Sequence, residues 1–198
     1  MKIQFSPIVS RGTFRSLRGL FPAALFALVA PFVHAAGDSL LPDGSLEIPN
    51  SSGEWPLGWG KAKNVRWESE AGNFFFRLVS PAPGTHVNLY QKVVLPADVT
   101  ALELSYRVRV SGIEVGVERW YDARIIMNFR DAAGKITTAK PTPYYNRSTE
   151  GWVLTVHRIE VPAGSVTLEF LPSLFRVTSG VFDLDDIVLK PIERISNP

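Results

Sequence analysis

FDLDDIVL, residues 182–189, is an apolar, strand-like stretch that carries three aspartates close to the end of the chain. Successive side chains of a β-strand point to opposite faces of its sheet. Phe182 and Leu184 therefore share one face, whereas Ile187 and Leu189 belong to the other. Both pairs are typical of a protein core, so a regular strand would leave one of them exposed.

One additional residue would bring both apolar pairs to the same face. Such an insertion is a β-bulge, and the spacing predicts it at Asp185-Asp186. Bulges re-aim side chains and are frequent beside functional sites. Carboxylates held near a core also need a partner, because burying an unpaired charge is unfavourable. We therefore expect another part of the chain to supply that partner.

Other segments show the same alternation of apolar and polar residues. The predicted strands cover residues 74–79, 87–95, 102–110, 123–129, 152–161, 166–171 and 181–189. Turns rich in proline and glycine separate them, and no run of ten or more residues has a helical period. The sequence therefore predicts an all-β fold, a two-sheet antiparallel β-sandwich of the jelly-roll kind.

The first 36 residues have the pattern of a secretory signal peptide. Four basic residues and no acidic one lie in residues 1–18, and an apolar stretch and the small residues Ala35-Ala36 follow. The apolar stretch, residues 19–33, is too short to span a membrane as a helix. We expect cleavage after it and a secreted or periplasmic protein.

The remaining chain predicts one domain, residues 37–190, followed by a short tail, residues 191–198. Removing four of the 21 basic residues leaves 17 against 19 acidic ones, a net charge of about −2. This balance does not favour nucleic acid as a partner, and we expect no membrane association after cleavage. The absence of cysteine excludes disulfides, and we expect a monomer.

Motifs at both ends of this domain resemble those of one protein family. Leu41-Pro42-Asp43-Gly44-Ser45-Leu46-Glu47 and the following Trp55-Pro56-Leu57-Gly58-Trp59 resemble the opening of calcium-containing β-jelly-roll carbohydrate-binding modules of families four, nine and twenty-two. Gly180 and the run from Asp185 to Leu189 are similar to the closing motif of those modules. Asp43 and Leu46 depart from the usual asparagine and phenylalanine, and residues 116–130 are not part of the general pattern.

The resemblance implies a structural calcium ion that ties the first part of the domain to the last strand. The implied carboxylate ligands are Glu47 and Asp186, with Asp185 as the alternative, and backbone oxygens around Gly72 would complete the shell. Calcium prefers six to eight hard oxygen ligands, which carboxylates and carbonyls supply. The alternative is that the two aspartates cap a strand end or pair with arginine.

Strand parity also predicts a ligand-binding face. If the strand at 123–129 extends back far enough, its non-core face carries Trp120, Arg124 and Asn128. The side chains expected beside them from other strands are Tyr90, Lys92, Asn88, Arg107 and Arg109. Aromatic faces stack on sugars and polar side chains bind their hydroxyls. Tyr144 and Tyr145 in a long loop are expected at the rim. The sequence therefore predicts a site for a polysaccharide or oligosaccharide.

Two other functions stay open at this point. A jelly-roll glycosidase or polysaccharide lyase would need two placed carboxylates or a Tyr/His acid–base pair. The only dense acidic cluster, residues 183–186, is explained by the metal, and neither His86 nor His157 lies in a catalytic motif. A structural or adhesive surface domain would instead present a featureless outer sheet face. We expect a non-catalytic module.

Overall fold

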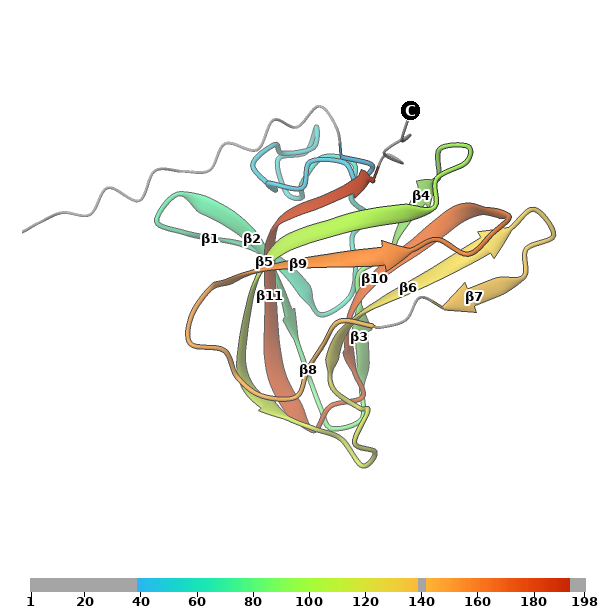
Figure 1. The fold of residues 1–198 in the computed structure, drawn as a ribbon. Helices are drawn as coiled ribbons and strands as arrows, with labels where there is room; N and C mark the ends of the chain where they lie inside the picture. The colour runs from blue at the N-terminus through green and yellow to red at the C-terminus, as the bar shows by residue number, and fades with distance from the viewer. Residues whose placement is uncertain (1–38, 139–141, 193–198) are drawn as a thin grey trace, which may run out of the picture. The chain divides into compact units, whose positions relative to one another are not determined.

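A computed structural model describes residues 39–138 and 142–192, which belong to the compact unit Ala35–Pro198. The predicted signal peptide, residues 1–36, and most of the predicted tail lie outside the described residues. Two antiparallel sheets form a sandwich (Figure 1), so the predicted all-β fold is confirmed. No helix in the described part of the chain is long and apolar enough to cross a membrane.

The first sheet has five strands. Their order across the sheet is β1 (Val65–Glu70), β2 (Asn73–Val79), β11 (Ser179–Pro191), β5 (Ala101–Glu114) and β9 (Val153–Glu160). The last strand therefore lies at the centre, between β2 and β5. It extends one residue past the predicted domain end, and the Ile192 amide donates to the Ala101 carbonyl.

The second sheet has six strands arranged around β6 and β10. β10 (Ser165–Phe175) pairs along one edge with β6 and along the other with two short strands, β3 (His86–Asn88) and β4 (Gln91–Val94). β6 (Ala123–Asp131) pairs in turn with β7 (Ile136–Thr138) and β8 (Tyr144–Tyr145). Several residue pairs across β6 and β10 therefore continue into a residue of a flanking strand.

The core lies between the two sheets and follows the predicted alternation. On β5 the even-numbered residues from Leu102 to Val110 are buried, and on β6 the odd-numbered residues from Ala123 to Phe129 are buried. Trp55 and Trp59 pack against Phe76 with ring-centroid distances of 5.3 and 5.1 Å.

The predicted bulge is present in β11. Its register against β5 shifts between Asp185 and Val188, and Asp186 adopts a left-handed φ of 49°. Phe182, Leu184, Ile187 and Leu189 are all fully buried as a result. The Ile187 amide donates to the carbonyl of Gly44, at 2.8 Å, so the opening segment is hydrogen-bonded to the bulge.

Candidate functional site

The outer surface of the second sheet forms a continuous face of mixed polar, apolar and aromatic side chains. One row across it joins Lys92, Glu169, Asn128 and Thr138. A second row joins Asn88, Ser173, Arg124 and Tyr144, and its Ser173 is buried beneath the surface. Between these rows lie half-buried Leu171 and Ile126, which are paired across β10 and β6. We call this surface, together with Tyr90, the β6–β10 face.

Tyr90 gives the β6–β10 face an exposed aromatic ring. It lies between β3 and β4, with 46% of its surface exposed, and its hydroxyl is 3.5 Å from Glu169 Oε1. The partly exposed Leu171 and Ile126 add apolar surface in the row where Tyr90 falls by register. A flat aromatic ring next to apolar and hydrogen-bonding groups suits a sugar, which has both C–H surfaces and hydroxyls.

Asn128 is a hydrogen-bonding group in the middle of the β6–β10 face. Its Oδ1 accepts a hydrogen bond of 2.8 Å from the Thr138 hydroxyl of β7. This contact holds the amide in place, while its Nδ2 has no partner among the described residues. An amide positioned in this way can donate to a ligand hydroxyl.

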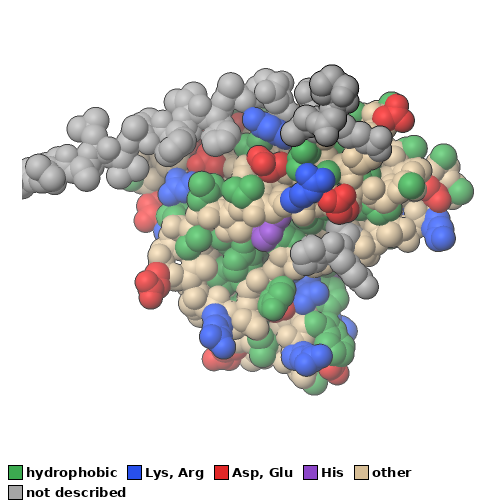
Figure 2. All heavy atoms as spheres, viewed as in Figure 1, with side chains coloured by type: hydrophobic (Ala, Val, Ile, Leu, Met, Phe, Trp, Pro, Cys, Tyr) green, Lys and Arg blue, Asp and Glu red, His purple; other side chains and the backbone are tan. Residues whose placement is uncertain are grey.

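Two arginines of the face already have acidic partners. Arg130 Nε donates to Glu169 at 2.7 Å, and Arg124 Nε donates to Asp122 at 2.6 Å. Asp122 is almost fully buried, and this burial raises the pKa of its carboxyl against the opposing effect of Arg124. These pairs neutralise both guanidinium groups, so the face has no strong excess of positive charge. Figure 2 shows basic and acidic side chains interspersed in the same way over the side of the molecule that it draws.

Trp120 lies at one end of the face but not on β6. The strand begins at Ala123, so the condition on which we placed Trp120, that the strand extends back to it, is not met, because residues 117–120 form a bend and a turn. The side chain is 50% exposed, as expected, and its backbone carbonyl accepts a hydrogen bond from Arg124 Nη2. Trp120 is therefore positioned beside the end of the face by Arg124.

The two tyrosines predicted for the rim have different positions. Tyr144 is opposite Arg124 in the β6–β8 pairing and is 61% exposed, so it borders the face. Tyr145 turns inward: its hydroxyl is 2.7 Å from the hydroxyl of Tyr106, and its ring packs 5.8 Å from that of Phe182. The rim prediction was wrong for Tyr145, because neighbouring strand residues face opposite sides.

Glu169, Leu171 and Ser173 were missed as residues of the face by sequence reasoning. The first two belong to a predicted strand with clear alternation, so parity would have placed them. Ser173 lies beyond the predicted end of that strand, because β10 continues through Pro172 to Phe175.

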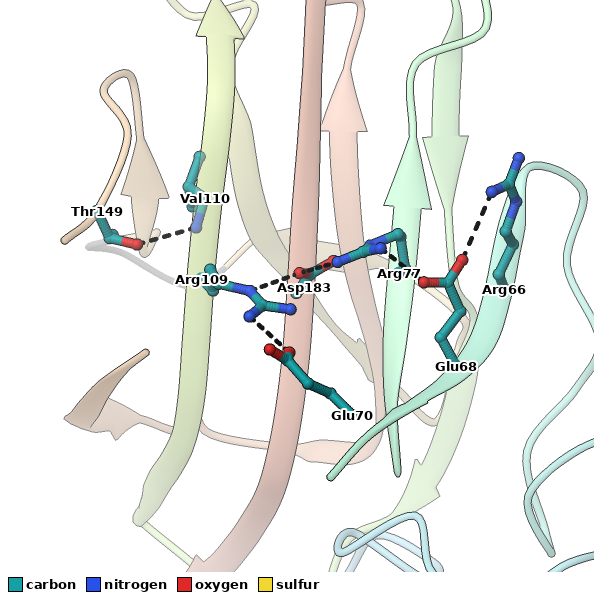
Figure 3. Close-up of polar contacts among 8 residues, drawn as sticks. All are labelled: Arg66, Glu68, Glu70, Arg77, Arg109, Val110, Thr149 and Asp183. Atoms are coloured by element: carbon teal, nitrogen blue, oxygen red, sulfur yellow. Dashed lines mark hydrogen bonds and ion pairs between the residues drawn. The ribbon is translucent and has the colours of Figure 1, made fainter. Parts of the chain in front are cut away.

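The outer surface of the first sheet carries a network of ion pairs (Figure 3). Asp183, which is 1% exposed, accepts hydrogen bonds of 2.8 to 2.9 Å from both Arg77 and Arg109. Arg77 also contacts Glu68 at 2.6 Å, and Arg109 contacts Glu70 at 2.7 Å. These two arginines are the partners of one of the three aspartates in FDLDDIVL.

Three of the four predicted metal-site residues gather around the start of β2. Glu47 Oε1 accepts from the Phe74 amide at 2.7 Å, and Asp185 Oδ2 accepts from Asn73 Nδ2 at 2.8 Å. Gly72 belongs to the turn just before these residues. Asp186 lies apart from this pair of contacts, 3.8 Å from Arg107.

Asp185 is the buried member of this group. It is 0% exposed, and this burial raises the pKa of its carboxyl to about 6, although the hydrogen bond from Asn73 opposes the shift. Within residues 39–138 and 142–192, no three His, Cys, Asp or Glu side chains gather as a metal cluster. A calcium ion here would therefore need backbone or water oxygens in addition to the two carboxylates.

Comparison with solved structures shows the same fold in carbohydrate-binding modules. A family 16 carbohydrate binding module-2 matches 78% of this chain and 100% of its own, with a TM-score of 0.53 and 18% identity. The CBM22-1 xylan-binding domain of Paenibacillus barcinonensis Xyn10C matches 81% and 98%, with a TM-score of 0.51 and 18% identity.

Part of an enzyme has this fold as well. The arabinose-bound α-L-arabinofuranosidase MgGH51 matches 78% of this chain over 26% of its own, with a TM-score of 0.53 and 13% identity. No model of a protein family matches the chain, and a search of curated proteins finds no match. At these identities the similarity shows a shared fold.

Proposed function

We propose that this protein binds a polysaccharide or oligosaccharide on the β6–β10 face without cleaving it. The observation that carries the proposal is the composition of the face: exposed Tyr90, the apolar pair Leu171 and Ile126, and the fixed amide of Asn128. The face extends over the six strands of its sheet, which suits a chain of sugars better than a compact metabolite. The fold shared with a xylan-binding domain supports this ligand class.

The charges of the face favour a neutral glycan. Arg124 and Arg130 are each neutralised by an acidic partner, and bidentate binding of a ligand carboxylate would have to displace that partner. Lys92 is exposed and has no acidic partner among the described residues. A single lysine contributes a point charge rather than a built anion site.

The acidic residues of the face favour binding over catalysis. A glycosidase needs a proton-donating carboxyl within reach of the glycosidic oxygen. Glu169 is held by Arg130, and Asp122 is almost fully buried against Arg124. Both carboxylates therefore have a structural partner in the place where an acid–base residue would need access to substrate.

Affinity electrophoresis tests this function. The protein is run in gels that contain xylan, mixed-linkage glucan, galactan or a polyuronate, and retardation by a neutral polymer is expected. Tyr90→Ala should weaken this binding by about 30-fold, because truncating a stacking aromatic costs about 2 kcal/mol. Leu154→Ala on the outer surface of the first sheet is the matched control and should bind as the wild type does. Equal retardation of Tyr90→Ala and the control would refute the β6–β10 face as the binding site.

We also propose that calcium stabilises the domain through Glu47 and Asp185. The residues fit such an ion in two respects. Their carboxylates contact adjacent residues of β2, and the buried Asp185 accepts from the neutral amide of Asn73 while Arg107 forms its ion pair with Asp186. When bound, the ion would neutralise these carboxylates and link the opening segment to β11. Asp186, which lies against Arg107, is the less favourable ligand.

Thermal unfolding in calcium and in excess chelator tests this second proposal. A ligand that binds only the folded state raises stability by about 2.7 kcal/mol at 100 times its dissociation constant. Chelation should therefore lower the Tm of the wild type and leave that of Glu47→Gln unchanged. An identical Tm in calcium and in excess chelator would exclude the ion, provided that elemental analysis shows the chelated protein to be free of metal.

Residues 1–36 support export as the route by which the protein reaches its ligand. Their charge and apolar pattern is that of a cleaved signal peptide, and polysaccharides of this kind are extracellular polymers. We therefore propose a secreted or periplasmic location, which N-terminal sequencing of the exported protein would check.

A further inference from the structure

Three loops at one end of the sandwich surround a cavity that is separate from the β6–β10 face. The cavity has a volume of about 380 Å³, and its lining includes Gly84, Gly116, Glu118, Tyr121, Arg176 and Thr178. These residues come from the β2–β3 loop, the β5–β6 loop and the β10–β11 turn. Ligand pockets begin at roughly 300 Å³, so the cavity is large enough for about one sugar ring.

The cavity combines an aromatic ring with a hydrogen-bond donor and an acceptor. Arg176 lies over the ring of Tyr121, 5.3 Å from its centroid, and Arg176 Nη1 donates to the Tyr121 hydroxyl at 3.0 Å. Neither Arg176 nor Glu118 has an ion-pair partner among the described residues, unlike Arg124 and Arg130 on the face. The cavity therefore offers guanidinium donors and carboxylate acceptors that no oppositely charged side chain occupies.

The three loops are fixed to one another by backbone contacts. The Gly84 amide donates to the Val177 carbonyl at 2.9 Å, and the Thr178 hydroxyl donates to the Val115 carbonyl at 2.9 Å. Gly116 approaches the backbone of Arg176 so closely that a Cβ atom would lie 2.2 Å from its carbonyl oxygen. These contacts fix the backbones of the three loops that carry the lining residues.

Arg176 occupies this cavity at a conformational cost. Its φ of 54° lies in the left-handed region, where glycine or asparagine is favoured and other residues are strained by about 1 kcal/mol or more. A side chain retained in a strained backbone position is an indication of function. Here that side chain is the cation over Tyr121.

We propose that this loop cavity is a second binding site, for a single ring of a neutral sugar. A hydroxyl both accepts and donates hydrogen bonds, so adjacent hydroxyls can satisfy Arg176 and Glu118 together. An anion would be repelled by Glu118, and a cation by Arg176. The ring of Tyr121 and exposed Val117 provide apolar surface for the C–H groups of the sugar. This proposal rests on the proposed carbohydrate function but names a different site.

The two sites are separated by a row of aromatic residues. Tyr121 packs edge-on against Phe175 at 5.6 Å, and Phe175 packs against His86 at 4.9 Å, at the end of β3 and β10. Arg124 of the face lies against Phe175, whereas Arg176 of the cavity lies against Tyr121. One sugar chain can therefore end at the cavity, or two chains can bind independently.

The test is a titration with xylohexaose and with galactotriose, followed by amide NMR shifts of the wild type and three variants. Gly84 and Gly116 report on the cavity, and residues 124–130 report on the face. The face variant is Tyr90→Ala combined with Asn128→Ala. The cavity variant is Arg176→Gly, which relieves the strained φ, and Asp98→Gly is its control because Asp98 has a φ of 61° in a turn outside the cavity.

In the face variant, the amides of Gly84 and Gly116 should still shift on titration. In Arg176→Gly, the dissociation constant obtained from these shifts should rise at least tenfold. Arg176→Gly should unfold at the same temperature as the wild type or above it, so lost binding cannot be ascribed to lost folding. Asp98→Gly should bind normally.

Other results separate this proposal from the proposed function. If only amides of the face shift, the cavity is not a binding site and the proposed site on the face stands. The same conclusion follows if the cavity shifts vanish in the face variant. Unchanged cavity shifts in Arg176→Gly also overturn the second site. Shifts in the cavity alone refute the face and keep the cavity. No shift with either sugar refutes both for these ligands.

Discussion

Asp183 shows at the scale of a single residue how a buried carboxylate is stabilised in this fold. It receives hydrogen bonds from Arg77 and Arg109, and this contact is the largest cause of the raised pKa of Arg77. Both guanidinium groups also lie about 5 Å from the ring centroid of Phe75, which packs edge-on against Trp152. The sequence indicates that a carboxylate of this strand needs a partner. It does not indicate which residue supplies that partner, since parity does not specify which strands are neighbours.

Asp183→Asn should lower the free energy of unfolding by about 3 kcal/mol, because it leaves two neighbouring arginines without their shared anion. Chemical denaturation measures the effect. Glu70→Gln is the control: its side chain is 60% exposed and also contacts Arg109, so its loss should cost less than about 1 kcal/mol. Similar losses for both variants would contradict a special role of the buried position.

His157 gives the stability a dependence on pH. Burial lowers the pKa of its imidazole below the usual value of about 6.5, and its Nε2 lies 3.2 Å from the Tyr106 hydroxyl. As the pH falls below about 6.5, the unfolded chain takes up this proton before the folded protein does, so stability is lost on acidification.

His157→Gln should therefore lose less Tm than the wild type when the pH is lowered from 7.5 to 5.5. Other groups with shifted pKa values, among them His86 with a lowered pKa and Asp122 and Asp185 with raised ones, are present in both proteins and cancel in the comparison. Differential scanning calorimetry at the two pH values measures the difference. Parallel losses in the two proteins would rule out His157 as the source.

At the scale of the strands, alternation predicted those elements that have one buried and one outer face. β6 was predicted almost completely for this reason, and β5 over residues 102–110, whereas its last four residues, up to Glu114, were missed. The predicted strand 87–95 is instead two strands, because Leu89 lies opposite Pro172 of β10, and a proline cannot donate a ladder hydrogen bond. β1 was missed because only Val65 of its six residues is buried, so the edge strand has no apolar alternation.

The bulge of β11 depends on a glycine far away in the sequence. Gly44 accepts the Ile187 amide through its carbonyl, and a Cβ atom at position 44 would lie 1.8 Å from the Ile187 carbonyl oxygen. The opening motif thus has a packing role, which its order in the sequence alone did not reveal.

Gly44→Ala should therefore destabilise the protein by about 3 kcal/mol or more, because backbone atoms must move to admit the methyl group. Gly134→Ala is the matched control: it has a φ of 81° and open space, so only backbone strain of about 1 kcal/mol is expected. Equilibrium unfolding in urea measures both. Equal costs would show that the contact with Ile187 is not tight.

At the scale of the whole domain, parity predicted which sheet surface carries the candidate site. It placed Arg124 and Asn128 on one face with Tyr90, and the structure brings them together. It was wrong for Arg107 and Arg109, which lie on β5 in the other sheet, because parity does not specify which sheet a strand joins. It could not predict the inward turn of Tyr145 or the turn at Trp120, because these depend on where β8 and β6 begin after irregular segments. The loop cavity could not be predicted from the sequence either, because it is formed by three loops that only the fold brings together.

The central claim, that a sugar chain binds the β6–β10 face, is tested most directly by mapping where a neutral oligosaccharide contacts the protein. Backbone amide shifts on titration with xylohexaose should change along β4, β6 and β10, with the largest changes near Tyr90, Asn128 and Leu171. The amide chemical shifts of β5, β9 and β11, in the other sheet, should not change. Shifts confined to those three strands, with none on β6 and β10, would contradict the account.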